Sequence, residues 1–310
     1  MAIKIKNVND IDNTEWLELR KIGIGGSDAA AIAGLNPWKS PFSVYLEKTT
    51  DGVKEIPDNE RMRVGRDLED YVARRFEEAT GKKVRRNNFM LQSEEYPFMT
   101  ANVDREVVGE NAVLECKTTS SYNRKDWEEG IPLHYHMQVL HYMLVGGYDK
   151  GYIACLVGNE AFIWHEIERD EETLNYLVEI ESRFWNDLQK GIMPSPDGSG
   201  DYDNALKEKY KDSIEDEILL DIKENRFELL NELKLIKSDT ETKIKAIEQE
   251  IKLSIGEYQK GYIGTYQATW KPQTRTSIDT KRLKEELPDI AEKYSKTIET
   301  RVLRIKEIKE

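Results

Sequence analysis

Cysteine is scarce in this chain, because its 310 residues include only Cys116 and Cys155. Two thiols so far apart in the sequence cannot supply a four-thiolate zinc or iron–sulfur site, and nothing suggests secretion. Long apolar runs are also missing, and residues 1–10 alternate Lys with Ile instead of building the apolar region of a signal peptide. We therefore expect a reduced cytoplasmic protein with no membrane span.

An excess of basic residues is lacking too. The chain has 46 Lys and Arg against 59 Asp and Glu, which gives a net charge of −13. A protein that coats duplex DNA is expected to be basic, because counterion release needs Lys and Arg against the phosphates. The charge argues against an extended nucleic-acid-binding surface, but it leaves room for an enzyme with an acidic exterior and a local basic channel.

Helical and strand patterns alternate over the first 195 residues. Apolar residues at helical spacing predict helices over 29–33, 42–48, 61–80, 133–145 and 170–188. Apolar, β-branched stretches bounded by turn residues predict strands over 84–92, 99–108, 112–118, 150–157 and 161–167. This alternation predicts an α/β fold, with a mixed central sheet flanked by helices.

The composition changes after the Pro- and Gly-rich stretch 194–200. Beyond it, apolar residues recur at helical spacing within Lys- and Glu-rich sequence, and this pattern predicts a helical hairpin. An alternating stretch at 262–270, a helix from Asp279 and a strand over 300–306 then predict a small α+β tail. We therefore expect a catalytic domain over 1–195, a hairpin over 201–256 and the tail over 257–310.

The stretch with the clearest chemistry is Asp104, followed after a turn by Leu114-Glu115-Cys116-Lys117. Side chains alternate along a strand, so Glu115 and Lys117 share one face while Cys116 points the other way. Two carboxylates and a backbone carbonyl, that of Cys116, suit Mg²⁺. Such a metal can polarise a phosphodiester, and a nearby Lys can position the attacking water.

A single D…ExK pattern is weakly specific, because short acidic–basic triplets are common on exposed strands. The residues around Glu115 are apolar, however, so these charges lie on a strand that is otherwise buried and need partners or a metal. Glu69, on the 61–80 helix, and Gln138, on the 133–145 helix, are further candidates. Taken alone, Glu69 fits a solvated helix charge and Gln138 fits a polar cross-link in the core.

Three histidines on one predicted helix, His134, His136 and His141, suggest a competing zinc or general-base site. His134 and His141 are one heptad apart and lie near one face. No nearby Cys or acid completes a ligand set, so the residues favour aromatic packing near the core or a DNA contact.

Taken together, the motifs resemble lambda exonuclease and the YqaJ-like viral recombinases of the PD-(D/E)XK nuclease superfamily. The resemblance covers about residues 15 to 190 in family order. It is carried by Gly-Ile-Gly-Gly-Ser-Asp-Ala-Ala, Asn-Pro-Trp-Lys-Ser-Pro-Phe, Gly-Arg-Asp-Leu-Glu69, Pro97-Phe98-Met99 to Asp104, Leu-Glu115-Cys-Lys117 and the Tyr135/Gln138 helix. Asn102 and Val103 depart from the pattern, because many members have a small polar residue and proline there.

The resemblance implies a restriction-endonuclease-like core and a Mg²⁺-dependent 5′→3′ exonuclease. Such an enzyme degrades one strand of linear duplex DNA to leave 3′ overhangs for recombination by single-strand annealing. In the family the corresponding acids bind two metal ions, so Glu69, Asp104 and Glu115 would hold two Mg²⁺, for which Mn²⁺ can substitute. Lys117 would activate the water, and Gln138 would support the site.

Arg20 and Ser27 match, in type and spacing, the family residues that hold the 5′-phosphate of a DNA end. A basic side chain beside a Gly-rich turn with free N–H groups makes a plausible phosphate pocket, although an ordinary surface ion pair explains Arg20 equally well. The resemblance also implies a ring-shaped trimer, a single-strand annealing protein as partner, and a phage or prophage protein in the bacterial host cytoplasm.

Two other functions fit the same sequence. The core could serve a structure-specific or single-strand-specific endonuclease, which would also cut circular DNA. It could instead serve a DNA-end-binding module without chemistry, although the intact Asp104, Glu115 and Lys117 argue against that.

Overall fold

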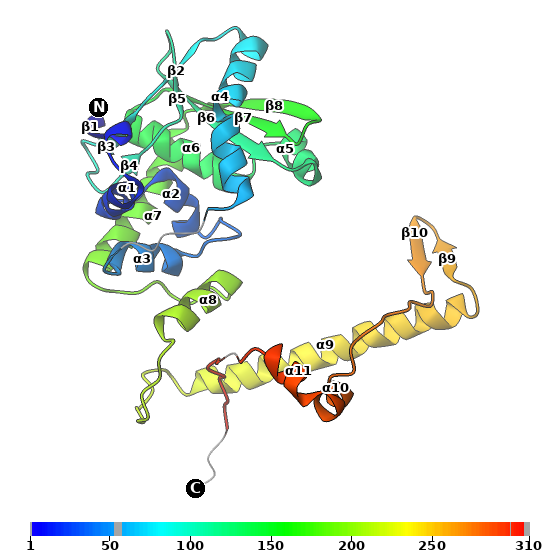
Figure 1. The fold of residues 1–310 in the computed structure, drawn as a ribbon. Helices are drawn as coiled ribbons and strands as arrows, with labels where there is room; N and C mark the ends of the chain where they lie inside the picture. The colour runs from blue at the N-terminus through cyan, green and yellow to red at the C-terminus, as the bar shows by residue number, and fades with distance from the viewer. Residues whose placement is uncertain (1, 53–57, 298, 307–310) are drawn as a thin grey trace. The chain divides into compact units, whose positions relative to one another are not determined.

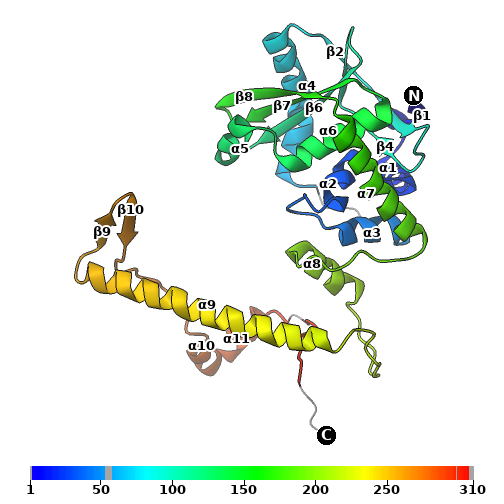
Figure 2. The same ribbon diagram turned by 180° about the vertical axis from the view of Figure 1, so that it is seen from behind.

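The computed structural model describes residues 2–52, 58–297 and 299–306. The chain forms two compact units, Met1–Lys211 and Asp212–Glu310, which Figures 1 and 2 show from opposite sides. Among the described residues, no helix is long and apolar enough to cross a membrane.

The first unit is built around a five-stranded sheet with the strand order β2-β5-β6-β7-β8. Its strands are β2 (Val84–Arg86), β5 (Arg105–Val107), β6 (Ala112–Thr119), β7 (Lys150–Val157) and β8 (Ala161–Glu168). Only β6 and β7 are parallel; the other neighbours pair antiparallel. The parallel pair requires a crossover, which α5 (Arg124–Glu129) and α6 (Leu133–Gly146) supply. The predicted mixed sheet flanked by helices is confirmed.

Two helices cover opposite faces of this sheet, α4 (Glu60–Thr80) on one and α6 on the other (Figures 1 and 2). On the α4 face, Phe76 packs in one core cluster with Leu114 of β6. On the α6 face, Val113 of β6 joins a cluster with Leu140. Adjacent residues of β6 therefore pack into hydrophobic clusters on opposite faces of the sheet. This explains why consecutive residues of the strand are apolar, instead of alternating with polar ones. α4 ends at Gly81, whose φ of 72° favours glycine.

The predicted strands 84–92 and 99–108 are each interrupted. β3 (Phe89–Ser93) and β4 (Thr100–Ala101) leave the main sheet and pair with β1 (Ala2–Asn7) in the order β1-β3-β4. The first break follows Asn87, whose side chain accepts a hydrogen bond from the Phe89 N–H. The second break spans residues 102–104, so Asp104 lies just before β5 and not within a strand.

Five further helices pack below the sheet and complete the first unit: α1 (Asn13–Leu19), α2 (Gly26–Ile32), α3 (Pro41–Thr49), the longer α7 (Glu171–Gln189) and α8 (Gly200–Lys209). α8 is bound to α3, because Asp201 Oδ2 accepts hydrogen bonds from the Ser40 N–H and from the Ser43 hydroxyl at 2.7 and 2.6 Å. Tyr202 also stacks on Phe42, with ring centroids 4.5 Å apart.

The expected hairpin over 201–256 is therefore not present. Its first helix, α8, belongs to the first unit, and the second unit has one long helix instead, α9 (Asn225–Ile255). Ile214 and Ile218 have helical spacing, yet they are 88% and 82% exposed and lie outside any helix.

The tail of the second unit follows the prediction in part. β9 (Lys260–Ile263) and β10 (Tyr266–Thr269) form an antiparallel hairpin in the alternating stretch. Asp279 caps α10 (Thr280–Glu286) by accepting from the Arg282 N–H at 3.0 Å, and α11 (Pro288–Lys293) follows. The strand expected over 300–306 does not form.

Candidate active site

Glu115 and Lys117 project from the same face of β6, as their spacing predicts. The Lys117 ammonium lies 2.5 Å from Glu115 Oε1, and the intervening Cys116 packs instead in the cluster on the α4 face. Glu115 is 3% exposed, and its Oε2 is buried without a hydrogen-bond partner among the described residues. A buried carboxylate oxygen without a partner is costly, so this atom is suited to a ligand.

Asp104 meets Glu115 from the break before β5. β5 pairs with β6 only as far as Leu114, so it leaves the Cys116 N–H without a strand partner, and Asp104 Oδ2 accepts that hydrogen at 2.8 Å. Burial and the neighbouring Glu115 carboxylate raise the pKa of Asp104 well above its usual range. Two acids that disfavour each other's charge in this way form a site that a divalent cation stabilises.

Lys117 is a firmly charged cation. Burial lowers the pKa of Lys117, but the carboxylates of Glu115 and Asp104 outweigh burial and hold that pKa above its usual value. The ammonium also lies 4.9 Å from the ring centroid of Tyr135 on α6. In this arrangement Lys117 supplies positive charge to the site.

Glu69 reaches the same neighbourhood from α4, but Arg105 binds it. The Arg105 guanidinium donates to Glu69 Oε1 at 2.5 Å, to the Asp104 carbonyl at 2.6 Å and to Asp70 Oδ1 at 2.5 Å. In the described part of the chain, no three His, Cys, Asp or Glu side chains gather as a set that could hold a metal ion. The roles of Glu69 and of the Cys116 carbonyl as ligands thus stay predictions.

Gln138 joins the acids from α6, as predicted. Its Nε2 donates to Glu115 Oε1 at 2.8 Å and to the Tyr142 hydroxyl at 2.7 Å. The Tyr142 ring in turn lies against Gly26 at the start of α2, where an added Cβ would come within 2.4 Å of the ring. Only glycine allows this approach, which connects the acids to the Gly-rich turn.

A basic cluster surrounds that turn. Arg20 Nη2 lies 3.1 Å from the exposed Ser27 hydroxyl, as the sequence pairing predicts. The cluster is centred on Asp28, a fully buried carboxylate that contacts Lys39 at 2.9 Å and Lys48 at 2.7 Å, with Arg20 at 3.5 Å. Burial alone would raise the pKa of Asp28, but these three cations hold it well below its usual range.

Comparison with known proteins shows the family of this chain. The family model of the YqaJ-like viral recombinase domain matches residues 15–149. A curated relative, the uncharacterised protein YqaJ of Bacillus subtilis (strain 168), is 44% identical over 307 residues, which cover 97% of this chain and 96% of the relative. This chain belongs to the YqaJ-like viral recombinase family.

Two solved structures are similar to this chain. The structure of LHK-Exo in complex with dAMP matches with a TM-score of 0.51 and 18% identity, over 64% of this chain and 97% of that one. The alkaline exonuclease LHK-Exo from Laribacter hongkongensis matches with a TM-score of 0.49 and 16% identity, over the same shares of the two chains. The first likeness confirms the PD-(D/E)XK fold class.

Among the described residues, the histidines of this YqaJ-like chain do not gather with acids or thiols into a set that could hold a metal ion. His134 packs on aromatic rings, as expected, and burial lowers the pKa of His136. His141 is fully buried and does have an acidic partner, Glu181 of α7, at 2.9 Å. Its Nε2 donates to the Thr100 carbonyl at 2.8 Å. The pair links α6, α7 and β4 and is structural.

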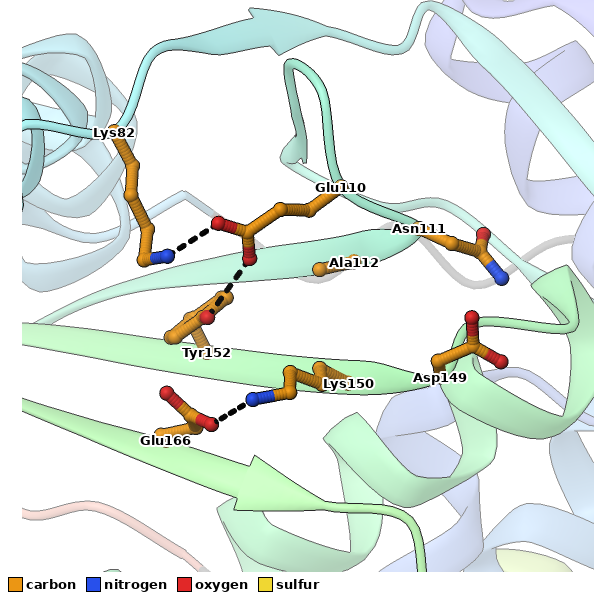
Figure 3. A pocket seen from close by; sticks show the side chains of 8 residues that line it. All are labelled: Lys82, Glu110, Asn111, Ala112, Asp149, Lys150, Tyr152 and Glu166. Atoms are coloured by element: carbon orange, nitrogen blue, oxygen red, sulfur yellow. Dashed lines mark hydrogen bonds and ion pairs between the residues drawn. The ribbon is translucent and has the colours of Figure 1, made fainter.

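A polar pocket of about 330 Å³ opens at the other end of β6, away from Lys117 (Figure 3). Four of its charged side chains pair with each other: Glu110 accepts from Lys82 and from the Tyr152 hydroxyl, and Lys150 pairs with Glu166. None of the predicted site residues lines this pocket.

Three residues that contact the candidate site residues were not singled out from the sequence: Asp28, Arg105 and Tyr142. Asp28 lies within the quoted Gly-rich motif and Arg105 directly follows Asp104, so both adjoin recognised positions. Tyr142 is one helical turn beyond Gln138, and that spacing alone could have suggested a contact.

Proposed function

We propose that this chain is a divalent-metal-dependent exonuclease that acts on the ends of linear duplex DNA. The proposal rests on one observation: contacts through Gly26, Tyr142 and Gln138 connect two sites of opposite charge. One site is the buried pair Asp104 and Glu115, which favours a cation. The other is the basic cluster at Arg20 and Ser27, which favours a phosphate.

The residues present fit a magnesium site. Asp104 and Glu115 offer hard carboxylate oxygens, and one of them, Glu115 Oε2, has no hydrogen-bond partner among the residues that the structure describes. Glu69 is close by as a further ligand. We propose that they hold two Mg²⁺, for which Mn²⁺ can substitute. Bound there, the metal would supply Lewis acidity toward a phosphodiester and lower the pKa of an attacking water.

The protein's own groups position this chemistry. Lys117, charged and fixed between Glu115 and Tyr135, balances negative charge on the scissile phosphate and orients the attacking water. Gln138 fixes the Glu115 carboxylate through its amide. Arg105 holds Glu69 next to Asp104, because its guanidinium contacts both residues.

We propose 5′→3′ polarity from the position of the basic cluster. A 5′-phosphate bound by Arg20 and Ser27 would place the next phosphodiester toward Glu115, since Gly26 adjoins Ser27 and packs on the Tyr142 that contacts Gln138. The product would be a duplex with a 3′ single-stranded overhang, the substrate of a single-strand annealing partner. A ring-shaped trimer with a basic passage would reconcile DNA binding with the net charge of −13.

Digestion of linear and circular duplex DNA tests this function. The substrate is labelled at its 5′ or 3′ end, with or without a 5′-phosphate, and incubated with Mg²⁺ or with EDTA. We expect early release of 5′-terminal mononucleotides, a faster reaction with the 5′-phosphate, and no reaction in EDTA or on circles.

Each of the other outcomes would support a different function. Internal fragments, or equal attack on circles, would retain the metal site and make the protein an endonuclease. Binding to DNA ends without cleavage in any divalent ion would leave a DNA-end-binding module. Early release from the 3′ end would contradict the role of Arg20 and Ser27.

A further inference from the structure

Trp38 lies in the connection between α2 and α3, and the residue is 65% exposed. The turn is fixed, because the Trp38 N–H donates to Asn36 Oδ1 at 2.9 Å and Pro37 restricts the backbone between them. Single exposed apolar side chains are common on protein surfaces, so exposure alone assigns no role. The neighbours of this indole decide what it can do.

A row of rings connects Trp38 to Lys117. The His134 ring meets the indole edge-on, with centroids 4.9 Å apart and planes at 87°. His134 also packs on Tyr135, with centroids 4.0 Å apart, and the Lys117 ammonium lies 4.9 Å from the Tyr135 centroid. An edge-on contact supports the indole from one side and leaves its exposed surface open to a flat partner.

The next residue along the chain connects Trp38 to the basic cluster. Lys39 contacts Asp28 at 2.9 Å, and Asp28 also binds Lys48 and Arg20. Trp38 is therefore connected to both sets of proposed groups, through its neighbour Lys39 to those for the 5′-phosphate and through the rings of His134 and Tyr135 to those for the scissile phosphate. In an enzyme that releases mononucleotides, these two phosphates flank a single nucleotide, and its base must lie beside them.

The support under the indole is uncharged at neutral pH. Burial and the Lys117 charge lower the pKa of His134 from its usual value. Its Nε2 is buried and has no hydrogen-bond partner in the part of the chain that the structure describes. A neutral ring there brings no charge to compete with stacking on the exposed indole surface.

We propose that Trp38 forms a subsite on which the nucleobase of the 5′-terminal nucleotide stacks. This inference rests on the proposed exonuclease function and adds a contact for the base to the contacts for its phosphates. Stacking on an aromatic side chain accepts any of the four bases, because each base has a π face. The subsite therefore holds the unpaired terminal nucleotide in place without sequence preference.

Pairing a protein variant with a substrate that lacks the base tests the subsite. The substrates are 5′-phosphorylated duplexes with either a normal or an abasic 5′-terminal nucleotide. On normal DNA, we expect Trp38→Ala to lower kcat/KM about tenfold and Trp38→Phe to retain most of it, within the range that stacking on one base allows. On the abasic substrate, the parent and Trp38→Ala should be equally slow.

Fluorescence gives a readout that does not need cleavage. With 2-aminopurine as the 5′-terminal base and Ca²⁺ in place of Mg²⁺, binding to the parent should quench the fluorescence, and binding to Trp38→Ala should not. Tyr176→Ala is the matched control, because Tyr176 is an aromatic residue of α7 that is 62% exposed. It should behave as the parent in both assays.

The outcomes separate the subsite from the function on which it rests. If the parent cleaves but Trp38→Ala loses nothing, or loses the same factor on both substrates, the subsite is wrong and the exonuclease stands. An equal loss that accompanies a lower oligomeric mass would instead assign Trp38 to contact with a second copy. If the parent neither cleaves linear DNA nor quenches 2-aminopurine, both the function and the subsite are overturned.

Discussion

Two aspartates, Asp28 at the Gly-rich turn and Asp104 just before β5, have opposite electrostatic surroundings. Asp28 is surrounded by Lys39, Lys48 and Arg20, and its pKa is lowered well below its usual range. Asp104 is buried beside Glu115, and its pKa is raised well above its usual range. One aspartate thus lies in a site with an excess of positive charge, and the other lies in a site with an excess of negative charge.

This difference shows what each site lacks. Around Asp28, the three cations Lys39, Lys48 and Arg20 exceed the two carboxylates of Asp28 and Glu47 by one charge, so an anion complements the cluster. Around Asp104 and Glu115, Lys117 is the cation in direct contact, and Glu115 Oε2 has no partner among the described residues, so a further cation complements the pair. Burial strengthens both preferences, because charges interact more strongly away from water.

Glu115→Gln should produce the largest effect on the reaction. The change keeps the size of the side chain and an acceptor for Gln138 but removes the charge that favours a metal. We expect the rate of DNA cleavage to fall by at least about 10³-fold, since a metal ion contributes several kcal/mol to such a transition state. Cleavage near the parent rate, with folding verified by circular dichroism, would contradict the cation site.

Asp28→Ala should produce the largest effect on stability. Lys48 is almost fully buried, with a side chain 2% exposed, and would lose its carboxylate partner. Leaving one partner of a buried ion pair unpaired costs about 3–5 kcal/mol, measurable by urea denaturation. As control, Glu47→Ala removes the exposed partner of Lys39 and should cost at most about 1 kcal/mol. Equal losses would show that Asp28 does not organise the cluster.

Arg20→Ala should affect the recognition of the DNA end. The exposed Ser27 and the buried Asp28 would remain, but one charged hydrogen-bond donor to the phosphate would be lost. We expect the preference for a 5′-phosphorylated over a 5′-hydroxyl end to fall about tenfold, from initial rates on the two substrates. The rate on 5′-hydroxyl DNA should change little. A loss of the same size on both ends would assign Arg20 to the structure and not to phosphate binding.

The smallest expected effect is the change with pH in the free energy of unfolding that Asp28 contributes. Its pKa is lowered in the folded state, so its contribution is present above the unfolded pKa of about 4 and is lost as the pH falls below that value. The difference in unfolding free energy between the parent and Asp28→Asn should therefore be constant from pH 5 to 7 and shrink below about pH 4. A difference that grows in acid would reverse the sign assigned to this carboxylate.

Much of the first unit was predictable because its elements carry strong local signals. The spacing of Glu115 and Lys117 on a strand fixes their shared face, and Gly81 marks the end of α4. The break at residues 102–104 was not predictable, because it depends on where β5 stops pairing with β6. Asp104 gains its contact with the Cys116 N–H only through that break.

Long-range partners explain the other differences. Arg105 binds Glu69 from 36 residues away, and α8 is bound to α3 through Asp201 and Ser40, 161 residues apart. The spacing of residues near either end of these contacts does not predict them. In the second unit, apolar spacing predicted a helix around Ile214 and Ile218, where no element covers them. Local pattern therefore located the acids, while tertiary contacts decided how they are held.

Binding of Mn²⁺ in the absence of DNA tests most directly the claim that the acid pair is a cation site. Free Mn²⁺ is measured by electron paramagnetic resonance during titration of the parent protein and of Glu115→Gln. We predict saturable binding by the parent that Mg²⁺ displaces, and loss of that binding in Glu115→Gln with the secondary structure unchanged. Equal binding by both proteins, or none by the parent, would contradict the assignment of Asp104 and Glu115 as the metal site.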